Sequence, residues 1–359
     1  MIKAKSLNVG LLVLLGLSSF TPSMVWSAEL SSTDPLRDMT LPVGSIIAQP
    51  AQPVKEPTQS EHSGQRTPRV ALVLAGGGTR GVAHIGVLKA LQAAGIPIDF
   101  VAGSSIGSVI GGLFAAGVAP AEMERLVLSG KLRKAFFPVP FKLQAALYVP
   151  RYCLLRLFLQ KPDIGLYSGK SIAKFIRNNV PKNIRNIEDL KTPFSAISIN
   201  LNDSRPVWMT SGDLSQAIQA SCSVPFMYRP VKESNRLLVD GGLRANLPVA
   251  AGNALGSPIV IAVKLHSFLD TVDARNVDTH IEYADRVVSI MMAEIEESAV
   301  NKADLLIEPK VHYMSMYSYD KVSLKQAILD GEEAAQQMIP KIKARMRATA
   351  GALSELPLK

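Results

Sequence analysis

Cysteine is almost absent from this chain of 359 residues, and the two that occur, Cys153 and Cys222, form no pattern that could hold a metal. A zinc site needs several Cys or His ligands at short, regular spacing, so metal binding has no support. The two cysteines either pair in an oxidising compartment or remain buried free thiols, and the sequence allows both outcomes. We expect neither a metal ion nor another cofactor.

Nucleic-acid-binding motifs and internal repeats are also missing. The formal net charge is +9, yet no run of Lys and Arg coincides with a recognisable nucleic-acid-binding motif. This positive net charge is compatible with anionic partners and equally compatible with an ordinary solvated surface. The hydrophobic content of 47% excludes disorder for most of the chain and is enough for a large core. The sequence leaves the oligomeric state open.

The N-terminal apolar segment, residues 7–20, is too short and too often interrupted by Ser and Gly for a typical membrane span. Lys3 and Lys5 precede it, and Val25 and Ser27 fit a signal-peptidase site. We therefore expect a signal peptide over residues 1–27, with an uncleaved anchor as the alternative. Because no cysteine lies near this cleavage region, we do not expect a lipoprotein. Export to the periplasm is the expectation, with secretion or membrane association as alternatives.

Residues 28–68 carry six prolines among polar residues and show no sustained period, which predicts a flexible linker. A folded domain is expected from residue 69 to about residue 346, with a tail at 347–359. Within it, buried apolar runs alternate with helical patterns, which favours an α/β fold with a mostly parallel sheet between two helical layers. Strands are expected at 69–75, 98–103, 194–200, 206–211, 236–242, 258–265 and 304–310, and helices at 81–94, 107–117, 213–222 and 282–300.

The glycine cluster "AGGGTRG", residues 75–81, has two interpretations. Gly76, Gly78 and Gly81 satisfy the G-x-G-x-x-G spacing of a dinucleotide-binding turn. A ribose-binding acid should then stand at the end of the next strand, whereas Asp99 stands at its start. The end of that strand carries a serine instead, which favours a site for an oxyanion over a site for a phosphate.

That serine, Ser105, lies in "GSSIG" with Gly103 and Gly107 on either side. The pattern is G-x-S-x-G, in which a sharp strand-to-helix turn needs small residues two before and two after the nucleophile. Adjacent parallel strands would bring the amides of Gly76 to Gly78 beside the Ser105 hydroxyl, where they can stabilise a tetrahedral oxyanion. A tight packing turn without chemistry is the alternative.

A serine nucleophile needs a base, and the sequence offers two candidates. His266 follows the strand 258–265 and completes the order Ser, Asp, His of a triad esterase. Asp240 stands at the end of a strand in "LLVDGGLRANLP", with a structural turn as its alternative role. His84 lies inside the helix after the glycine cluster, and we expect it to be a packing residue.

Three motifs together, "GGGTRG", "GSSIG" and "DGG", resemble the patatin-like phospholipase family. The similarity extends to "HIGVLKAL", "GLYSGKS" and "ASCSVPFMYRPV", covers about residues 70–337 with a motif core near 70–255, and is strongest toward bacterial proteins related to the catalytic region of neuropathy target esterase. The resemblance implies a three-layer α/β/α fold.

By resemblance, Ser105 is the nucleophile and Asp240 its dyad partner, and no histidine is required. The resemblance also implies an oxyanion hole at Gly76, Gly77, Gly78, Thr79, Arg80 and Gly81, and a motif role for Gly241 and Gly242 beside Asp240. Arg80 would steady this loop or meet an anionic headgroup. The implied activity is hydrolysis of a carboxylic ester in a phospholipid or lysophospholipid. A triad esterase for small soluble esters and a non-catalytic lipid-binding protein remain alternatives.

Residues 125–162 are basic and aromatic and contain no acid. Such a segment fits a lid at a membrane surface, with Phe136 and Phe137 entering the headgroup boundary while Lys and Arg meet anionic lipid. A loop that covers the core with long basic side chains is equally compatible with the sequence. We expect peripheral membrane contact if the first interpretation holds.

Overall fold

The computed structural model describes residues 69–157, 164–254, 256–266 and 279–354. The expected signal peptide and the whole of the expected linker lie outside these residues, and so do residues 355–359 of the expected tail. Within the described residues, no helix is both long enough and apolar enough to cross a membrane.

Eight strands form one sheet in the order β5-β6-β3-β2-β1-β7-β8, with β4 paired to β3. Five neighbours, β3, β2, β1, β7 and β8, run parallel, which confirms the mostly parallel sheet of an α/β fold. The other three join by antiparallel pairing: β4 and β6 each pair with β3, and β5 pairs with β6. The strands are β1 Val70–Leu74, β2 Phe100–Ser104, β3 Phe194–Asn200, β4 Arg205–Met209, β5 Val231–Glu233, β6 Arg236–Asp240, β7 Ile259–Val263 and β8 Leu305–Ile307.

Helices cover both faces of the sheet. Gly111 of α2 (Ile106–Ala115) packs on Leu74 and Val101, whereas Gly252 of α8 (Val249–Ala254) packs on Ala71 and Val73. Alternate residues of a strand point to opposite faces, so these two helices belong to opposite layers. All five residues of β1 are fully buried, as expected for a strand covered on both sides.

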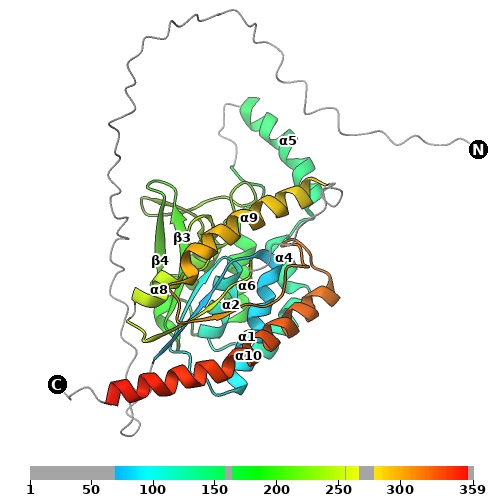
Figure 1. The fold of residues 1–359 in the computed structure, drawn as a ribbon. Helices are drawn as coiled ribbons and strands as arrows, with labels where there is room; N and C mark the ends of the chain where they lie inside the picture. The colour runs from blue at the N-terminus through cyan, green and yellow to red at the C-terminus, as the bar shows by residue number, and fades with distance from the viewer. Residues whose placement is uncertain (1–68, 158–163, 255, 267–278, 355–359) are drawn as a thin grey trace, which may run out of the picture. The chain divides into compact units, whose positions relative to one another are not determined.

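Figure 1 shows the other α-helices of the described residues. They are α1 Ala83–Ala93, α3 Pro120–Leu128, α4 Lys131–Phe136, α5 Phe141–Leu157, α6 Lys170–Asn179, α7 Leu214–Ser221, α9 His280–Val300 and α10 Lys321–Ser354. The sequence pattern missed α10, which lies along α1 (Figure 1). Because α10 continues to Ser354, the domain boundary expected at residue 346 falls inside a helix.

Candidate active site

Ser105 stands between β2 and α2 with a backbone φ of 51°. Such a conformation is costly for a residue with a Cβ, and it recurs where a functional side chain must project from a sharp turn. The Ser105 amide donates to Ser221 Oγ at 3.0 Å, and Ser221 Oγ in turn donates to the Ile197 carbonyl at 2.6 Å. No local sequence pattern indicates that Ser221 supports this turn.

The two glycines around Ser105 are required by close backbone approach. A Cβ on Gly103 would lie 2.4 Å from the carbonyl carbon of Gly107, and a Cβ on Gly107 would lie 2.3 Å from the Leu74 carbonyl oxygen. Neither contact is tolerable, so the turn can only be built with glycine at both positions. The structure therefore has the strand-turn-helix geometry that the G-x-S-x-G spacing predicts.

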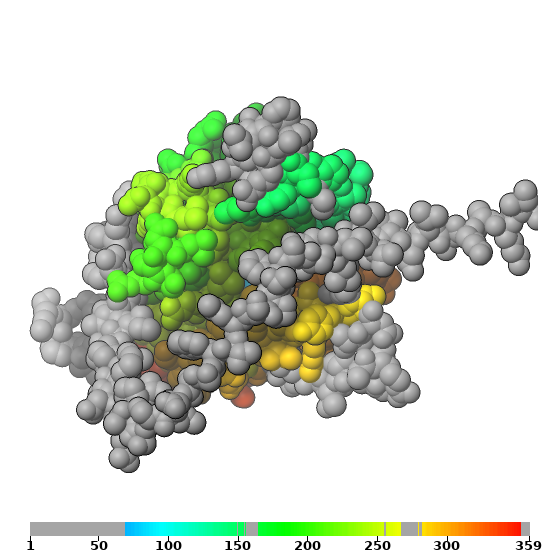
Figure 2. All heavy atoms as spheres, turned by 90° about the horizontal axis from the view of Figure 1, so that it is seen from above, coloured from blue at the N-terminus to red at the C-terminus, as the bar shows by residue number. Residues whose placement is uncertain are grey.

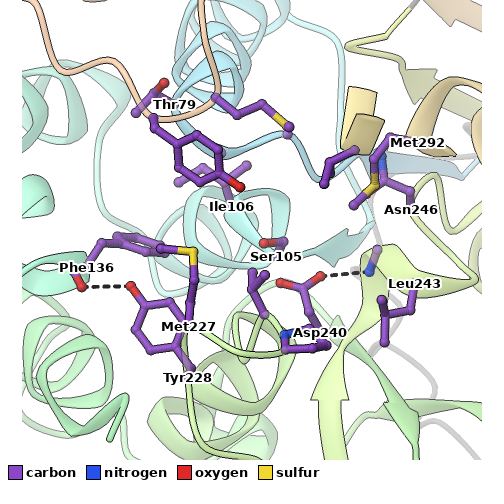
Figure 3. Close-up of a pocket in the computed structure, with 18 of the residues that line it drawn as sticks. Thr79, Ser105, Ile106, Phe136, Met227, Tyr228, Asp240, Leu243, Asn246 and Met292 are labelled. Atoms are coloured by element: carbon purple, nitrogen blue, oxygen red, sulfur yellow. Dashed lines mark hydrogen bonds between the residues drawn. The ribbon is translucent and has the colours of Figure 1, made fainter. Parts of the chain in front are cut away.

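Asp240 ends β6 and lies beside Ser105 (Figure 3). The register explains the meeting: Ser104 pairs with Ile197 on β3, and the adjacent Ser198 pairs with Asp240. Because β4 occupies the other edge of β3 at Ile197 and Ser198, β2 and β6 share one edge of β3, and antiparallel β6 runs head-on toward the end of β2, which brings Asp240 to Ser105. The sequence predicted that Asp240 stands at the end of a strand, but it did not specify the direction of that strand in the sheet.

The Asp240 carboxylate is buried and only partly satisfied. Its Oδ1 accepts a hydrogen bond from the Gly242 amide at 2.7 Å, whereas its Oδ2 has no hydrogen-bond partner among the described residues. Burial raises the pKa of Asp240 to about 6, against the opposing effects of the Gly242 amide and the nearby Ser105 hydroxyl. A carboxyl group with this pKa can both accept and return a proton near neutral pH.

The glycine loop presents two free amides. The Gly76 amide donates to the Asn246 carbonyl at 3.1 Å, the Thr79 amide to the Met316 carbonyl at 3.0 Å, and the Arg80 amide to the Gly77 carbonyl at 3.2 Å. The amides of Gly77 and Gly78 donate to no residue that the structure describes. Of the loop expected at 76–81, these two are the donors left for an oxyanion.

Arg80 is buried and holds the loop in place. Its Nε donates to the Met314 carbonyl at 2.6 Å, and its two terminal nitrogens reach Ser289 Oγ at 2.9 Å and Asp285 Oδ2 at 3.4 Å. Asp285 also accepts from the Met316 amide at 2.7 Å. Of the two roles expected for Arg80, the structure supports steadying the loop, because the side chain is 7% exposed and three of its five N–H groups are held by the surrounding residues.

The two histidines that the sequence brought forward are both buried. His84 Nε2 bonds the Ala75 carbonyl at 2.8 Å, and burial lowers its pKa to about 4, which fits the expected packing role. His266 Nδ1 bonds Glu296 Oε1 at 2.8 Å, and its ring packs against Gly77. His266 makes no hydrogen bond to Ser105 or Asp240, so these three side chains do not form a triad in the structure.

Sequence reasoning missed a buried polar cluster behind the glycine loop, formed by Asn246, Glu296 and His266. Asn246 Nδ2 donates to Glu296 Oε1 at 2.6 Å and to the Gly76 carbonyl at 3.2 Å. Glu296 Oε2 accepts from the His266 amide at 3.0 Å. A fixed polar cluster of this kind holds the backbone of the loop from behind. Its members lie 20 and 30 residues apart in the chain, a spacing that no local pattern reveals.

A mostly apolar cavity of about 300 Å³ opens above Ser105 and Asp240 (Figure 3). Helices α4 and α9, the glycine loop and the segment 224–228 supply its walls. Among the residues that line it are Leu132, Phe136, Phe137, Val224, Phe226, Met227, Tyr228, Leu243, Asn246, Val288, Met291, Met292, Ile295, Met316, Tyr317 and Tyr319. The dimensions and the lining suit a hydrocarbon chain better than a polar ligand.

Phe136 and Phe137 are half-buried and belong to this cavity wall. Phe136 packs edge-to-face on Tyr228, whose hydroxyl donates to the Phe136 carbonyl at 2.7 Å. Phe137 packs in the same manner on Tyr167 and Tyr319. These contacts place both phenylalanines in an aromatic cluster at the cavity, and their entry into a headgroup boundary stays a prediction.

Neither cysteine forms a disulfide. Cys153 is exposed on α5, and Cys222 is buried at the end of α7. Of the two outcomes that the sequence allowed, the structure has free thiols. Among the described residues, no group of three or more His, Cys, Asp or Glu is placed to bind a metal ion.

Comparison with known proteins identifies a family and several relatives that this chain resembles. The family model described as "Patatin-like phospholipase" matches residues 72–252, which is half of the chain. An NTE family protein of Mycobacterium tuberculosis is 33% identical over 241 residues, or 66% of this chain and 60% of that protein. Lysophospholipase NTE1 of Coccidioides immitis is 35% identical over 204 residues, or 56% of this chain and 12% of that protein.

The chain thus spans about 60% of the length of the mycobacterial relatives that it matches. Among solved structures, VipD from Legionella pneumophila superimposes with a TM-score of 0.44 at 14% identity, covering 77% of this chain and 67% of that one.

Proposed function

Because the chain belongs to the patatin-like phospholipase family, a family of carboxylic ester hydrolases, we propose that it is a serine lipid acyl hydrolase with a Ser105–Asp240 dyad. One observation carries the proposal: a serine on a strained turn lies beside a buried, partly satisfied carboxylate at an apolar cavity. A phospholipid or lysophospholipid is the proposed substrate, since its acyl chain matches the cavity lining.

In the proposed reaction, Asp240 accepts the Ser105 proton while Ser105 Oγ attacks the ester carbonyl carbon. The amides of Gly77 and Gly78 donate to the resulting oxyanion. Collapse of this intermediate breaks the ester C–O bond, and Asp240 returns its proton to the departing alcohol. Water then attacks the acyl-serine while Asp240 accepts its proton; the Ser105 Oγ–acyl bond breaks, Asp240 returns the proton to Ser105 Oγ, and the fatty acid is released. The raised pKa of Asp240 supports both proton transfers.

The test is labelling with a fluorophosphonate probe, followed by turnover on phospholipid and lysophospholipid substrates. The wild-type protein should label at one site and release fatty acid, whereas Ser105→Ala should do neither. No labelling of the wild type, or equal labelling of Ser105→Ala, would refute the nucleophile assignment. Products identified by mass spectrometry on a mixed panel would also define the acyl position.

The triad alternative is tested in the same assay with His266→Ala. Since His266 bonds Glu296 and not the dyad, we expect turnover to fall by less than about tenfold, against the loss of several orders of magnitude that removal of a triad member causes. A loss on that scale, at unchanged folding, would restore the triad.

We further propose that the protein is exported and works at a membrane surface, as residues 1–27 and the basic segment 125–162 suggest. Fractionation of cells that express the full chain with a C-terminal tag checks the first point: recovery of an unprocessed protein from the cytoplasm would contradict export.

A further inference from the structure

An exposed apolar stripe runs along α9. The relative solvent exposure is 63% for Tyr283, 37% for Val287, 48% for Ile290 and 55% for Met291. Their spacing of four, three and one residues places them on one side of a helix. Four large apolar residues exposed together on one helical face are unusual for a surface that only meets water.

The stripe is continuous with the mouth of the cavity. Met291 belongs to both, because it is exposed and also lines the cavity with Val288, Met292 and Ile295 of the same helix. In Figure 2 the surface is hollowed between the atoms of α5 and those of α9. A molecule that lies on the stripe therefore lies next to the cavity opening.

Phe226 adds a second apolar element to this opening. It lines the cavity, is 90% exposed and has a backbone φ of 67°. A bulky residue in that conformation is strained, and exposure of its ring to water does not offset the strain. Leu243, also a cavity residue, is 38% exposed. The opening thus has apolar side chains on more than one element.

The exposed charged residues near the opening are basic on α4 and acidic on α9. On α4, Leu132 and Phe136 line the cavity while Lys131, Arg133 and Lys134 are exposed. On α9, Glu282 and Glu294 are exposed beside the stripe. Attraction to an anionic surface must therefore come from α4, whereas α9 offers apolar contact. A second copy of this basic chain would bring like charges together, so an anionic lipid surface fits better.

We propose that the α9 stripe, with Phe226 and Leu243, docks the protein on a lipid bilayer so that the cavity opens into the headgroup boundary, and that Lys131, Arg133 and Lys134 of α4 attract anionic headgroups. This rests on the proposed function in one respect: the acyl chain that enters the cavity is that of the substrate. Docking moves the entry segment from Phe136 and Phe137, where the sequence placed it, to α9.

The test measures binding of the full chain to vesicles of phosphatidylcholine alone and of phosphatidylcholine with phosphatidylglycerol, by co-sedimentation. All proteins carry Ser105→Ala, so binding is scored without turnover. The double variant Val287→Ser/Ile290→Ser should weaken binding to both vesicles by about tenfold or more, because two apolar side chains leave the interface. The matched control Val322→Ser/Leu329→Ser removes two exposed apolar residues of α10 and should bind as the parent does.

The charge arm uses Lys131→Gln/Lys134→Gln. This variant should lose binding to the anionic vesicles only, and its binding should depend less on salt. With Ser105 restored, the stripe variant should label with fluorophosphonate and cleave a short soluble ester within about twofold of wild type, because Val287 and Ile290 do not line the cavity.

Two results would overturn the proposal. One is vesicle binding by the stripe variant equal to that of the α10 control. The other is a wild-type dimer that the stripe variant dissociates while vesicle binding is unchanged, which would make a second copy the occupant. Failure of the proposed function is a separate result, namely absence of labelling and ester cleavage in wild type, and it leaves the binding measurement intact.

Discussion

Asp240 and Glu296 are both buried carboxylates, but they differ in the number of hydrogen bonds that they accept. Glu296 accepts three hydrogen bonds, from Asn246 Nδ2, His266 Nδ1 and the His266 amide. Asp240 accepts one within the described residues, from Gly242, and its Oδ2 faces Ser105 with no other partner. The number of donors therefore separates a carboxylate that holds structure from one that is left able to take a proton.

The comparison shows why burial alone does not identify a catalytic acid or base. Both side chains are inaccessible to water. A buried carboxylate that is fully hydrogen-bonded rigidifies its surroundings, whereas a partly satisfied one keeps a reactive lone pair at an energetic cost. Chemistry and stability should therefore respond in opposite ways when each carboxylate is replaced by its amide.

Asp240→Asn should give the largest effect, a loss of turnover of about a thousandfold, because the amide cannot accept the Ser105 proton. The Gly242 amide can still donate to the Asn side-chain oxygen, so the turn should persist. Steady-state hydrolysis of a lysophospholipid measures the change, and circular dichroism checks the fold. Turnover within tenfold of wild type would remove Asp240 from the dyad.

The sequence predicted the parts of this site that local geometry determines. Ser105 could be found from its neighbours, because a turn that tight leaves a glycine pattern. Asp240 stood out through the glycines that follow it. The partners of Glu296 could not be found, since α9 meets the glycine loop only after the chain has folded. The aromatic contacts of Phe136 and Phe137 could not be found for the same reason, because their partners come from distant segments.

A second prediction uses pH to separate the two functions of Asp240. The folded-state pKa is raised from 3.8 to about 6, so the fold is destabilised progressively between about pH 4 and pH 6, fully above that window and not at all below it. A shift of that size corresponds to at most about 3 kcal/mol. The kcat/KM should rise through pH 6 as the base form accumulates, while the unfolding free energy falls relative to Asp240→Asn.

Urea unfolding of the wild type and Asp240→Asn at pH 4 and pH 8 measures the stability term, because other titrating groups cancel in the difference. Asp240→Asn should be the more stable protein at pH 8, with an advantage that shrinks toward pH 4. A difference that is independent of pH would mean that the Asp240 pKa is not raised.

Glu296→Gln should give the smallest and opposite effect. Its side chain has one acceptor oxygen and one NH₂ group, so one of the donors from His266 or Asn246 would face another donor. We expect a loss of about 2 kcal/mol in the unfolding free energy at pH 8, measured by urea, with turnover reduced by less than about tenfold. If turnover instead fell a thousandfold at unchanged stability, Glu296 and His266 would belong to the proton-transfer machinery, and the contrast between a structural and a reactive carboxylate would have to be reversed.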